Sequence, residues 1–208
     1  NGSQSYISTF KERFLGSIQT SAQVSHVYQT DDGVKVDTQS GQSLTVDYVV
    51  IATHADQALS ILKKPTDLES KLLGAWQYSK NSACLHTDSS VMSPKRTAWS
   101  SWLVKEGPEH AQALTMTYYM NRLQHIASPT DYFVSLNTTN QIEESKKIHM
   151  VTFKHPIYDS ESIASQSSLQ KLNNGPILFC GSYFGNGFHE DGIQSALHVC
   201  EKLGVRLD

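Results

Sequence analysis

The chain has 208 residues and a mass of 23.1 kDa; 38% of the residues are hydrophobic and 18% are charged. This length is enough for one well-packed domain or two small ones, and the composition excludes an intrinsically disordered tail. The 17 Lys and Arg residues stand against 20 Asp and Glu residues, which leaves a formal net charge of −3. Since no excess of positive charge is available for a phosphate backbone, we expect no nucleic-acid partner.

Two further features bear on membranes and metals. The longest apolar run, residues 48–52, is far shorter than the roughly 20 residues that cross a bilayer, and no basic and then apolar leader opens the chain. The three cysteines lack CxxC spacing, and the nine histidines form no HxxxH or HExxH motif. We therefore expect a soluble cytoplasmic protein with free thiols, no membrane span and no metal site.

Local patterns predict two helices and three strands before residue 65. Residues 5–15 carry apolar side chains near helical spacing, with Ser3 placed as the cap. Asp-Gly and Ser-Gly pairs separate segments rich in Val, Tyr and Thr, which predicts a three-stranded meander at residues 24–30, 33–38 and 44–53. The last strand is continuously apolar over residues 47–53, so we expect it to be central and covered on both faces. A short helix over residues 55–62 must end before Pro65.

The pattern changes between about residues 67 and 155, where polar and aromatic strand candidates follow one another with little helix. We predict strands at residues 81–87, 97–105, 112–121, 132–137 and 147–155. One of them shows the alternation of a sheet with one buried face, in Leu114, Met116, Tyr118 and Met120. We therefore predict a mainly antiparallel lobe over residues 61–159, and a second lobe built from residues 1–60 and 160–208.

The end of the chain predicts a helix, a strand, a glycine-rich turn and a last helix. Residues 160–172 are helical in pattern, residues 176–180 form a short buried strand, and the final amphipathic helix ends at Gly204. The turn brings free backbone N–H groups and the positive end of a helix dipole to one point, where anions or carbonyl oxygens bind. An ordinary connection between a strand and a helix would have the same pattern, so both interpretations stay open.

Two common phosphate-binding motifs are excluded at this turn. No Gly-Lys pair occurs in the chain, so it contains no P-loop. The sequence that begins at Gly185 fails the GxGxxG pattern at its sixth place, which is Glu190.

Taken together, these segments resemble the flavin-containing amine oxidase superfamily. The resemblance rests on Val24, on the Val-Val-Ile-Ala strand within residues 47–53, on a separate sheet-rich lobe, and on the terminal motif that runs from Gly181 through Gly-Phe-His-Glu-Asp-Gly at residues 187–192. The chain is most similar to bacterial predicted FAD-dependent oxidoreductases of the amine-oxidase type. It resembles only the C-terminal portion of such a protein, because the family's N-terminal strand with its GxGxxG motif has no counterpart here.

This resemblance implies a fold and a set of site residues. The fold would be α/β, mixed α+β in detail, with a partial FAD-binding Rossmann-like lobe and an antiparallel-sheet substrate lobe. The cofactor would be FAD, held by Val24, Gly181, Ser182, Gly187, Phe188, Asp191, Gly192 and Ile193. In the family, the amides near the last three residues meet flavin O2, the Gly181-Ser182 pair lies near the ribityl-phosphate, and the Val24 backbone meets the adenine. His189 falls beside the ring and is the catalytic candidate. Many relatives have an acidic residue in place of Ser182, so that contact is weakened here.

The function that the resemblance implies is an enzymatic one. The chain would be the C-terminal part of an FAD-dependent oxidoreductase that oxidises an amine-like or lipid-like small molecule by hydride transfer to flavin. The alternative is a non-catalytic binding module, or truncated remnant, that has lost the cofactor. Without the first strand, we expect the chain alone to bind FAD weakly or not at all and to be inactive.

Two other groups of residues have two possible roles each. His86 and Asp88 lie two residues apart on a predicted strand, where the carboxylate could orient the imidazole or a structural hydrogen bond could join them. Four aromatic residues of the middle lobe line either an apolar substrate pocket or the core of that lobe: Trp99, Trp102, Tyr118 and Tyr119.

Overall fold

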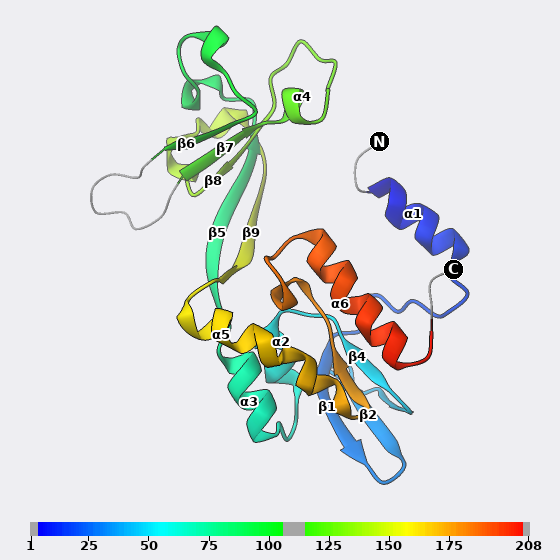
Figure 1. Cartoon of the computed structure of the whole chain (residues 1–208). Helices are drawn as coiled ribbons and strands as arrows, with labels where there is room; N and C mark the ends of the chain where they lie inside the picture. Colours follow the sequence, from blue (N-terminus) through cyan, green and yellow to red (C-terminus); the bar gives the residue numbers. More distant parts are fainter. Residues whose placement is uncertain (1–3, 106–114, 206–208) are drawn as a thin grey trace. The chain divides into compact units, whose positions relative to one another are not determined.

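The computed structural model describes residues 4–105 and 115–205 and divides into two compact units (Figure 1). One unit comprises residues 4–15, 79–105 and 115–155, and we call it the antiparallel unit. The other comprises residues 16–78 and 156–205, and we call it the mixed unit. The α/β fold class predicted from the sequence is confirmed.

The mixed unit opens with the predicted antiparallel meander. Its strands are β1 (Val24–Thr30), β2 (Gly33–Thr38) and β3 (Ser43–Val46), in the order β1-β2-β3. Gly33 has φ +132°, and a Cβ added there would lie 2.7 Å from the Val46 carbonyl oxygen. Only glycine therefore suits this tight turn.

The segment predicted as one strand over residues 44–53 is two strands in different sheets. After β3, strand β4 (Val49–Ile51) leaves the meander and pairs in parallel with β10 (Ile177–Phe179). Strands β2 and β3 are antiparallel, and Val46 pairs with Val34, next to the first residue of β2, Gly33. The residues after Val46 therefore run past the end of β2 and have no partner in the meander. The expectation of a central strand covered on both faces is also wrong, since Tyr48 is 57% exposed and Val50 is 42% exposed.

Helices pack around this pair of strands. They are α2 (Ala55–Ile61), α3 (Asp67–Gly74), α5 (Ser160–Leu169) and α6 (His189–Lys202), with short 3-10 segments η5 (Gln170–Asn174) and η6 (Ser182–Phe184). The shared core includes Val27, Ile51, Leu73, Trp76 and Phe179, all nearly or fully buried. Helix α6 packs separately on Leu178 and Cys180 through Val199 and Ala196.

Helix α3 was not predicted, and it moves the boundary between the lobes. Thr66 caps it, because its hydroxyl accepts the Glu69 amide while the Glu69 carboxylate accepts the Thr66 amide. Leu72, Leu73 and Trp76 belong to the core of the mixed unit. Residues 61–78 therefore group with the mixed unit instead of the antiparallel lobe to which the sequence pattern assigned them, and residues 4–15 group with the antiparallel unit.

The antiparallel unit is built on a five-stranded sheet. Its strands are β5 (Gln77–His86), β6 (Trp102–Lys105), β7 (Thr115–Tyr119), β8 (Phe133–Leu136) and β9 (Lys147–Ile157), in the order β6-β7-β8-β5-β9. Its short helical segments are η1 (Ser89–Val91), η2 (Arg96–Ala98), α4 (Met120–Leu123), η3 (Thr139–Gln141) and η4 (Glu144–Lys146). Helix α1 (Gln4–Arg13) also groups with this unit, although none of its side chains is buried.

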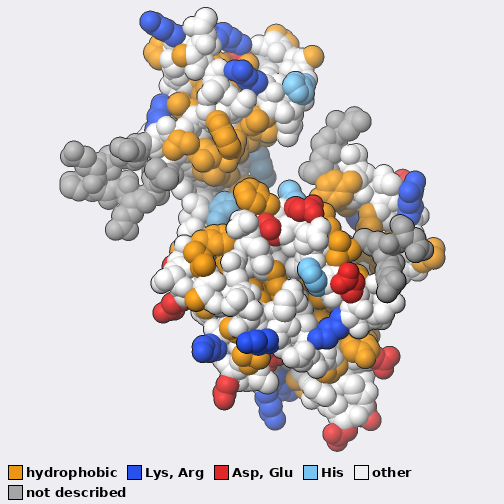
Figure 2. Space-filling model, viewed as in Figure 1, with side chains coloured by type: hydrophobic (Ala, Val, Ile, Leu, Met, Phe, Trp, Pro, Cys, Tyr) orange, Lys and Arg blue, Asp and Glu red, His pale blue; other side chains and the backbone are white. Residues whose placement is uncertain are grey.

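The two faces of this sheet differ in composition. Strand register places two apolar rows on one face, namely Trp102, Tyr118, Val134 and Leu85, and beside them Val104, Met116, Leu136 and Ala83. The opposite face packs against the unit's own loops and carries Leu103, Thr117, Ser135 and Cys84, with Tyr119, Phe133 and His86. Hydrophobic side chains gather at the surface over β6 and β7 in Figure 2. The apolar face is thus the more open one, with Trp102 61% exposed.

This register decides the role of the four aromatic residues. Trp99 and Tyr119 pack on buried Phe133, with ring centroids 5.6 and 5.4 Å away, and so belong to the core. Trp102 and Tyr118 lie opposite each other on the open face. The alternation of a strand therefore separates Tyr118 from its neighbour Tyr119.

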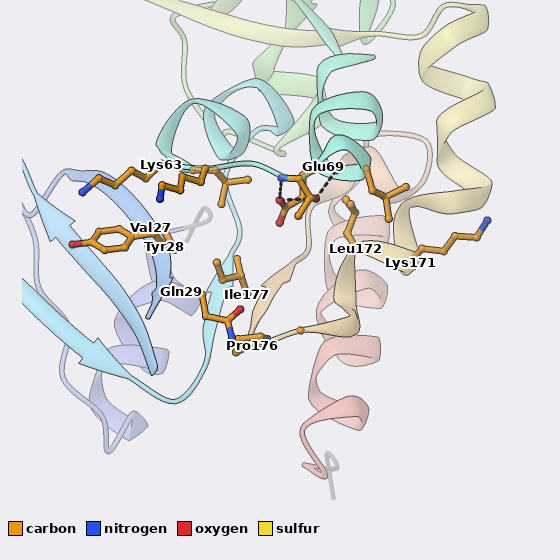
Figure 3. A pocket seen from close by; sticks show the side chains of 14 residues that line it. Val27, Tyr28, Gln29, Lys63, Glu69, Lys171, Leu172, Pro176 and Ile177 are labelled. Atoms are coloured by element: carbon orange, nitrogen blue, oxygen red, sulfur yellow. Dashed lines mark hydrogen bonds between the residues drawn. The ribbon is translucent and has the colours of Figure 1, made fainter. Parts of the chain in front are cut away.

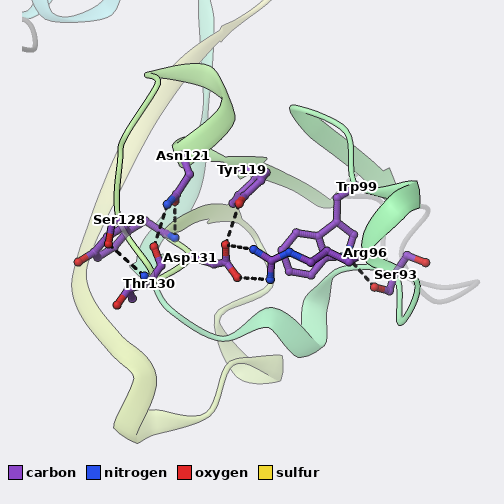
Figure 4. A network of polar contacts seen from close by, with 9 residues as sticks. Ser93, Arg96, Trp99, Tyr119, Asn121, Ser128, Thr130 and Asp131 are labelled. Carbon is purple, nitrogen blue, oxygen red and sulfur yellow. Dashed lines mark hydrogen bonds and ion pairs between the residues drawn. The ribbon is translucent and has the colours of Figure 1, made fainter.

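A polar network closes the edge of the antiparallel core (Figure 4). Arg96 forms two hydrogen bonds of 2.8 Å to Asp131, and the Tyr119 hydroxyl donates to the same carboxylate at 2.7 Å. The Arg96 guanidinium also lies over the Trp99 ring, 4.8 Å from its centroid. Burial alone would raise the pKa of Asp131, but the bonds from Arg96 and Tyr119 outweigh it and lower that pKa. Every charged member has a partner, which is typical of a structural network.

The buried His86 and Asp88 also belong to a structural network of hydrogen bonds. The Asp88 amide donates to His86 Nδ1 at 3.1 Å, so Nε2 carries the proton and donates to the Ser135 hydroxyl at 2.8 Å. The Asp88 carboxylate instead accepts the amides of Ser90 and Glu143. Of the two possible roles, the structural hydrogen bond is the one observed.

Candidate functional site

The glycine-rich turn lies at the carboxyl ends of the two parallel strands. Strand β10 ends at Phe179, and the chain passes through Gly181 and η6 to the first residue of α6, His189. In open parallel sheets, ligands bind beyond the carboxyl ends of the strands. The turn is therefore at the end of this sheet where a ligand is expected.

Five of the predicted site residues line one shallow hollow of about 450 Å³, namely Ser182, Gly187, Phe188, His189 and Gly192. Gly187 has φ +90°, a conformation that favours glycine. Phe188 projects into solvent at 71% exposure. The hollow thus combines backbone surface with an exposed aromatic ring, as a flat ligand requires.

The amides at the start of α6 that have no acceptor inside the helix are only partly those predicted from the sequence. The Gly192 amide already donates to the Phe188 carbonyl at 3.3 Å. Helix geometry leaves the amides of His189, Glu190 and Asp191 without an acceptor inside the helix. Of the predicted donors Asp191, Gly192 and Ile193, only Asp191 is among these three, because the helix begins at His189 and its fourth amide is already bonded.

Gly192 keeps space open on the ligand side of the helix. A Cβ added there would meet only the Ser182 amide nitrogen, at 3.9 Å, and no other described atom within 4 Å. The protein therefore does not need glycine at this position for its own packing. The start of α6 thus has both amides without a helical acceptor and open space at Gly192, two features that suit the edge of a planar carbonyl-bearing ring such as a flavin.

Two side chains that sequence patterns did not single out hold the turn in shape. The Ser195 hydroxyl accepts the Gly181 amide at 2.9 Å and lies 2.8 Å from the Gly192 carbonyl. From α5, the Gln166 amide group donates to the Gly185 carbonyl at 2.6 Å. A serine three residues after Gly192 is a weak sequence signal for Ser195, whereas nothing local points to Gln166.

Two tyrosines lie against the glycines of the turn. A Cβ at Gly181 would lie 2.6 Å from the Tyr183 ring, and a Cβ at Gly187 would lie 2.7 Å from the Tyr158 hydroxyl. Burial raises the pKa of Tyr158 and of Tyr183, so both are protonated near neutral pH. Tyr158 is a site neighbour that the sequence patterns did not single out.

Four predicted residues are not among those that line the hollow, namely Val24, Gly181, Asp191 and Ile193, and His189 lines it without a shown role. Val24 begins β1 in the meander and is not among the residues that line the hollow. Ile193 is 54% exposed and is not among the residues that line the hollow. The His189 imidazole is exposed and receives no hydrogen bond from the described residues, and its catalytic role stays a prediction.

A second hollow, also of about 450 Å³, lies near the amino end of β10 (Figure 3). Its apolar lining includes Val27 and Ile177. Lys63, at its rim, places its ammonium group 4.2 Å from the centroid of the Tyr28 ring, and the Glu69 carboxylate is held by Thr66. Because these charged groups are already partnered, this hollow is a weaker candidate than the glycine turn.

Residues 4–105 and 115–205 contain neither a membrane-spanning helix nor a cluster of metal ligands. No helix there combines the length and apolar character needed to cross a membrane. Nor do three or more His, Cys, Asp or Glu side chains cluster there in a way that could hold a metal ion. Cys84, Cys180 and Cys200 are free thiols.

Comparison by sequence gives one match. A family model described as flavin containing amine oxidoreductase matches residues 1–133. The matched range covers more than half of the chain and ends before the glycine turn. No curated protein matches the chain.

Comparison by structure gives several solved proteins that share the fold. A CLA-producing fatty acid isomerase from P. acnes has a TM-score of 0.67 at 10% identity, over 98% of this chain and 52% of its own. A putative protoporphyrinogen oxidase from Exiguobacterium sp. 255-15 has a TM-score of 0.67 at 12% identity, over 96% of this chain and 50% of its own. A putrescine oxidase has a TM-score of 0.63 at 10% identity, over 97% of this chain and 53% of its own. The chain thus spans about half the length of these structures, and at such identities the likeness shows the fold alone.

Proposed function

Because the chain belongs to the family of flavin-containing amine oxidoreductases, we propose that it forms the C-terminal part of an FAD-dependent oxidoreductase. The observation that supports this proposal best is the opening of α6. The amides of His189, Glu190 and Asp191 have no acceptor inside the helix, and Gly192, the fourth residue of the same helix, leaves open space where a side chain would lie. Such an arrangement can hold the pyrimidine carbonyl edge of a flavin.

Different residues of the turn would bind different parts of the flavin. The amides of His189, Glu190 and Asp191 would donate to the ring carbonyl, with the positive end of the α6 dipole behind them. Ser182 and Gly181 would face the ribityl chain, and Phe188 would lie along the ring. A bound flavin would supply the redox chemistry by accepting hydride from the substrate. The protein would contribute position and electrostatics.

The substrate we propose is an amine-like or lipid-like small molecule, bound by the antiparallel unit. The structural relatives are named for a fatty acid isomerase, a protoporphyrinogen oxidase and a putrescine oxidase, so this fold accommodates very different substrates. The open apolar face that contains Trp102 and Tyr118 suits a substrate with a large apolar part.

The proposal is tested by titrating FAD into the isotope-labelled chain and following its backbone amide signals by NMR, which detects weak binding. We expect the signals of His189, Glu190 and Asp191 to shift. Gly192→Ala should weaken this response at least tenfold, because the added methyl occupies the space beside the amides. The same substitution should raise the free energy of unfolding by about 0.5–1 kcal/mol, since alanine favours a helix over glycine and meets no close contact here.

Gly175→Ala is the matched control. A Cβ at Gly175 meets nothing within 4 Å, and this glycine has no positive φ. FAD binding should be unchanged in this variant. If FAD shifts other amides of the chain but none of these three, or shifts them equally in Gly192→Ala, the start of α6 is not a flavin site.

A further inference from the structure

The Asp191 side chain folds back over the turn that precedes its own helix. Its Oδ2 accepts the Phe188 amide at 2.9 Å. A Cβ added to Gly185 would lie 2.2 Å from Asp191 Oδ1 and 2.6 Å from its Cγ, so the carboxylate lies directly against the Gly185 backbone. One carboxylate therefore joins the first turn of α6 to two places in the glycine turn.

A second side chain holds the same backbone. Gln166 donates to the Gly185 carbonyl at 2.6 Å, so Gln166 and Asp191 both contact the Gly185 backbone. Only glycine leaves enough room for this arrangement. The path of residues 185–188, and with it the direction of the first free amides of α6, depends on Asp191.

The bond to Asp191 also selects which amides remain for a ligand. The Phe188 amide donates to the carboxylate, whereas the amides of His189, Glu190 and Asp191 have no acceptor among the described residues. Asp191 and Glu190 place two acidic side chains in the first turn, and this turn has no basic side chain apart from the imidazole of His189. These carboxylates offset the positive end of the helix dipole, which would otherwise attract anions such as phosphate.

We propose that Asp191 is a positioning residue of the flavin site, a proposal that rests on the function proposed above. Its carboxylate orients the three free amides toward one carbonyl oxygen. Its negative charge makes the site prefer a neutral carbonyl edge to an anion. Asp191 acts through the backbone and does not itself contact the ring.

The test uses the isotope-labelled chain, with riboflavin as the probe because it presents the ring without phosphate groups. Asp191→Ala should speed hydrogen exchange of the Phe188 amide at least tenfold and weaken riboflavin binding about tenfold, as expected for the loss of one charge-assisted hydrogen bond. Asp191→Asn keeps an acceptor oxygen and should restore most of both properties. Glu190→Ala is the control, since the Glu190 carboxylate bonds to Gln194 and not to the turn, and it should leave Phe188 exchange unchanged.

Inorganic phosphate tests the preference for a neutral ligand. Phosphate should not shift the three amides of the natural chain at concentrations where riboflavin does, and Asp191→Asn should make them respond. A phosphate response equal to that of riboflavin in the natural chain overturns the preference. Unchanged Phe188 exchange and unchanged riboflavin affinity in Asp191→Ala overturn the positioning role alone. If riboflavin shifts amides of the natural chain outside the turn and none within it, the flavin site itself lies elsewhere, and the role of Asp191 toward it is wrong as well.

Discussion

The side chain of Asn173 bonds to the backbone of Phe179 as a neighbouring strand would. Its Oδ1 accepts the Phe179 amide at 2.7 Å, and its Nδ2 donates to the Phe179 carbonyl at 3.0 Å. Both residues are buried. The outer edge of β10, next to the glycine turn, is thus completed by one side chain from η5.

Removing that side chain should destabilise the mixed unit. Asn173→Ala leaves a buried amide and a buried carbonyl without partners, so we expect the free energy of unfolding to fall by about 2–4 kcal/mol. Urea unfolding followed by circular dichroism measures the change. Asn174→Ala is the control, because Asn174 is exposed and bonds only to Lys202, and it should cost less than about 0.5 kcal/mol. Equal losses in the two variants would contradict the role of Asn173.

Asp88 should make the stability of the chain depend on pH in acid. Burial alone would raise the pKa of Asp88, but hydrogen bonds from the amides of Glu143 and Ser90 and from Lys146 outweigh it and hold this pKa far below its ordinary value. A group whose pKa is lower in the folded state stabilises the fold above its unfolded pKa, about 3.9, and this contribution is lost as the pH falls further.

Urea midpoints between pH 7 and pH 2 test this dependence. We expect the midpoint to fall most steeply below about pH 4, and Asp88→Asn to flatten that part of the curve while lowering stability at pH 7. Glu144→Gln is the control, since Glu144 forms only an exposed ion pair with Lys147. A curve for Asp88→Asn that runs parallel to that of the natural chain would show that Asp88 does not carry the effect.

Tyr78 and Tyr183 should respond differently to loss of the hydroxyl. The Tyr78 hydroxyl accepts the Ala55 amide at 2.9 Å, and burial raises the pKa of Tyr78 to about 12. The Tyr183 hydroxyl is buried and has no partner among the described residues. We therefore expect Tyr78→Phe to cost about 1 kcal/mol of unfolding free energy and Tyr183→Phe to cost nothing or to stabilise the fold slightly. A comparable cost for Tyr183→Phe would instead indicate an internal water bound to that hydroxyl.

Trp102 should dominate the quenching of tryptophan fluorescence by acrylamide. It is 61% exposed on the open apolar face, whereas Trp76 is 1% exposed and its indole donates to Ser165. Trp102→Phe should remove most of the quenchable emission, and Trp76→Phe should leave it in place. If Trp102 resists quenching, another molecule covers the apolar face in solution, and sedimentation velocity would show whether a second copy does so.

Local pattern was enough to predict the elements whose form depends on neighbouring residues. The turn at Gly33 and the helix that ends before Gly204 follow from residues within a few positions of each other. The glycines within residues 181–192 likewise predicted a turn between a strand and a helix. Such signals are local because turn conformation and helical periodicity are properties of the backbone and its nearest side chains.

Only the tertiary structure decided which distant residues meet. Strand β4 leaves the meander because β10, more than 120 positions later, offers it a parallel partner. Gln166 and Asn173 support the glycine turn through contacts that no local pattern marks. Asp191 appeared in the sequence as a donor of its amide, yet its carboxylate is what shapes the turn. These contacts depend on how separate elements pack, and a polar side chain has no periodic signature that reveals which backbone group it will satisfy.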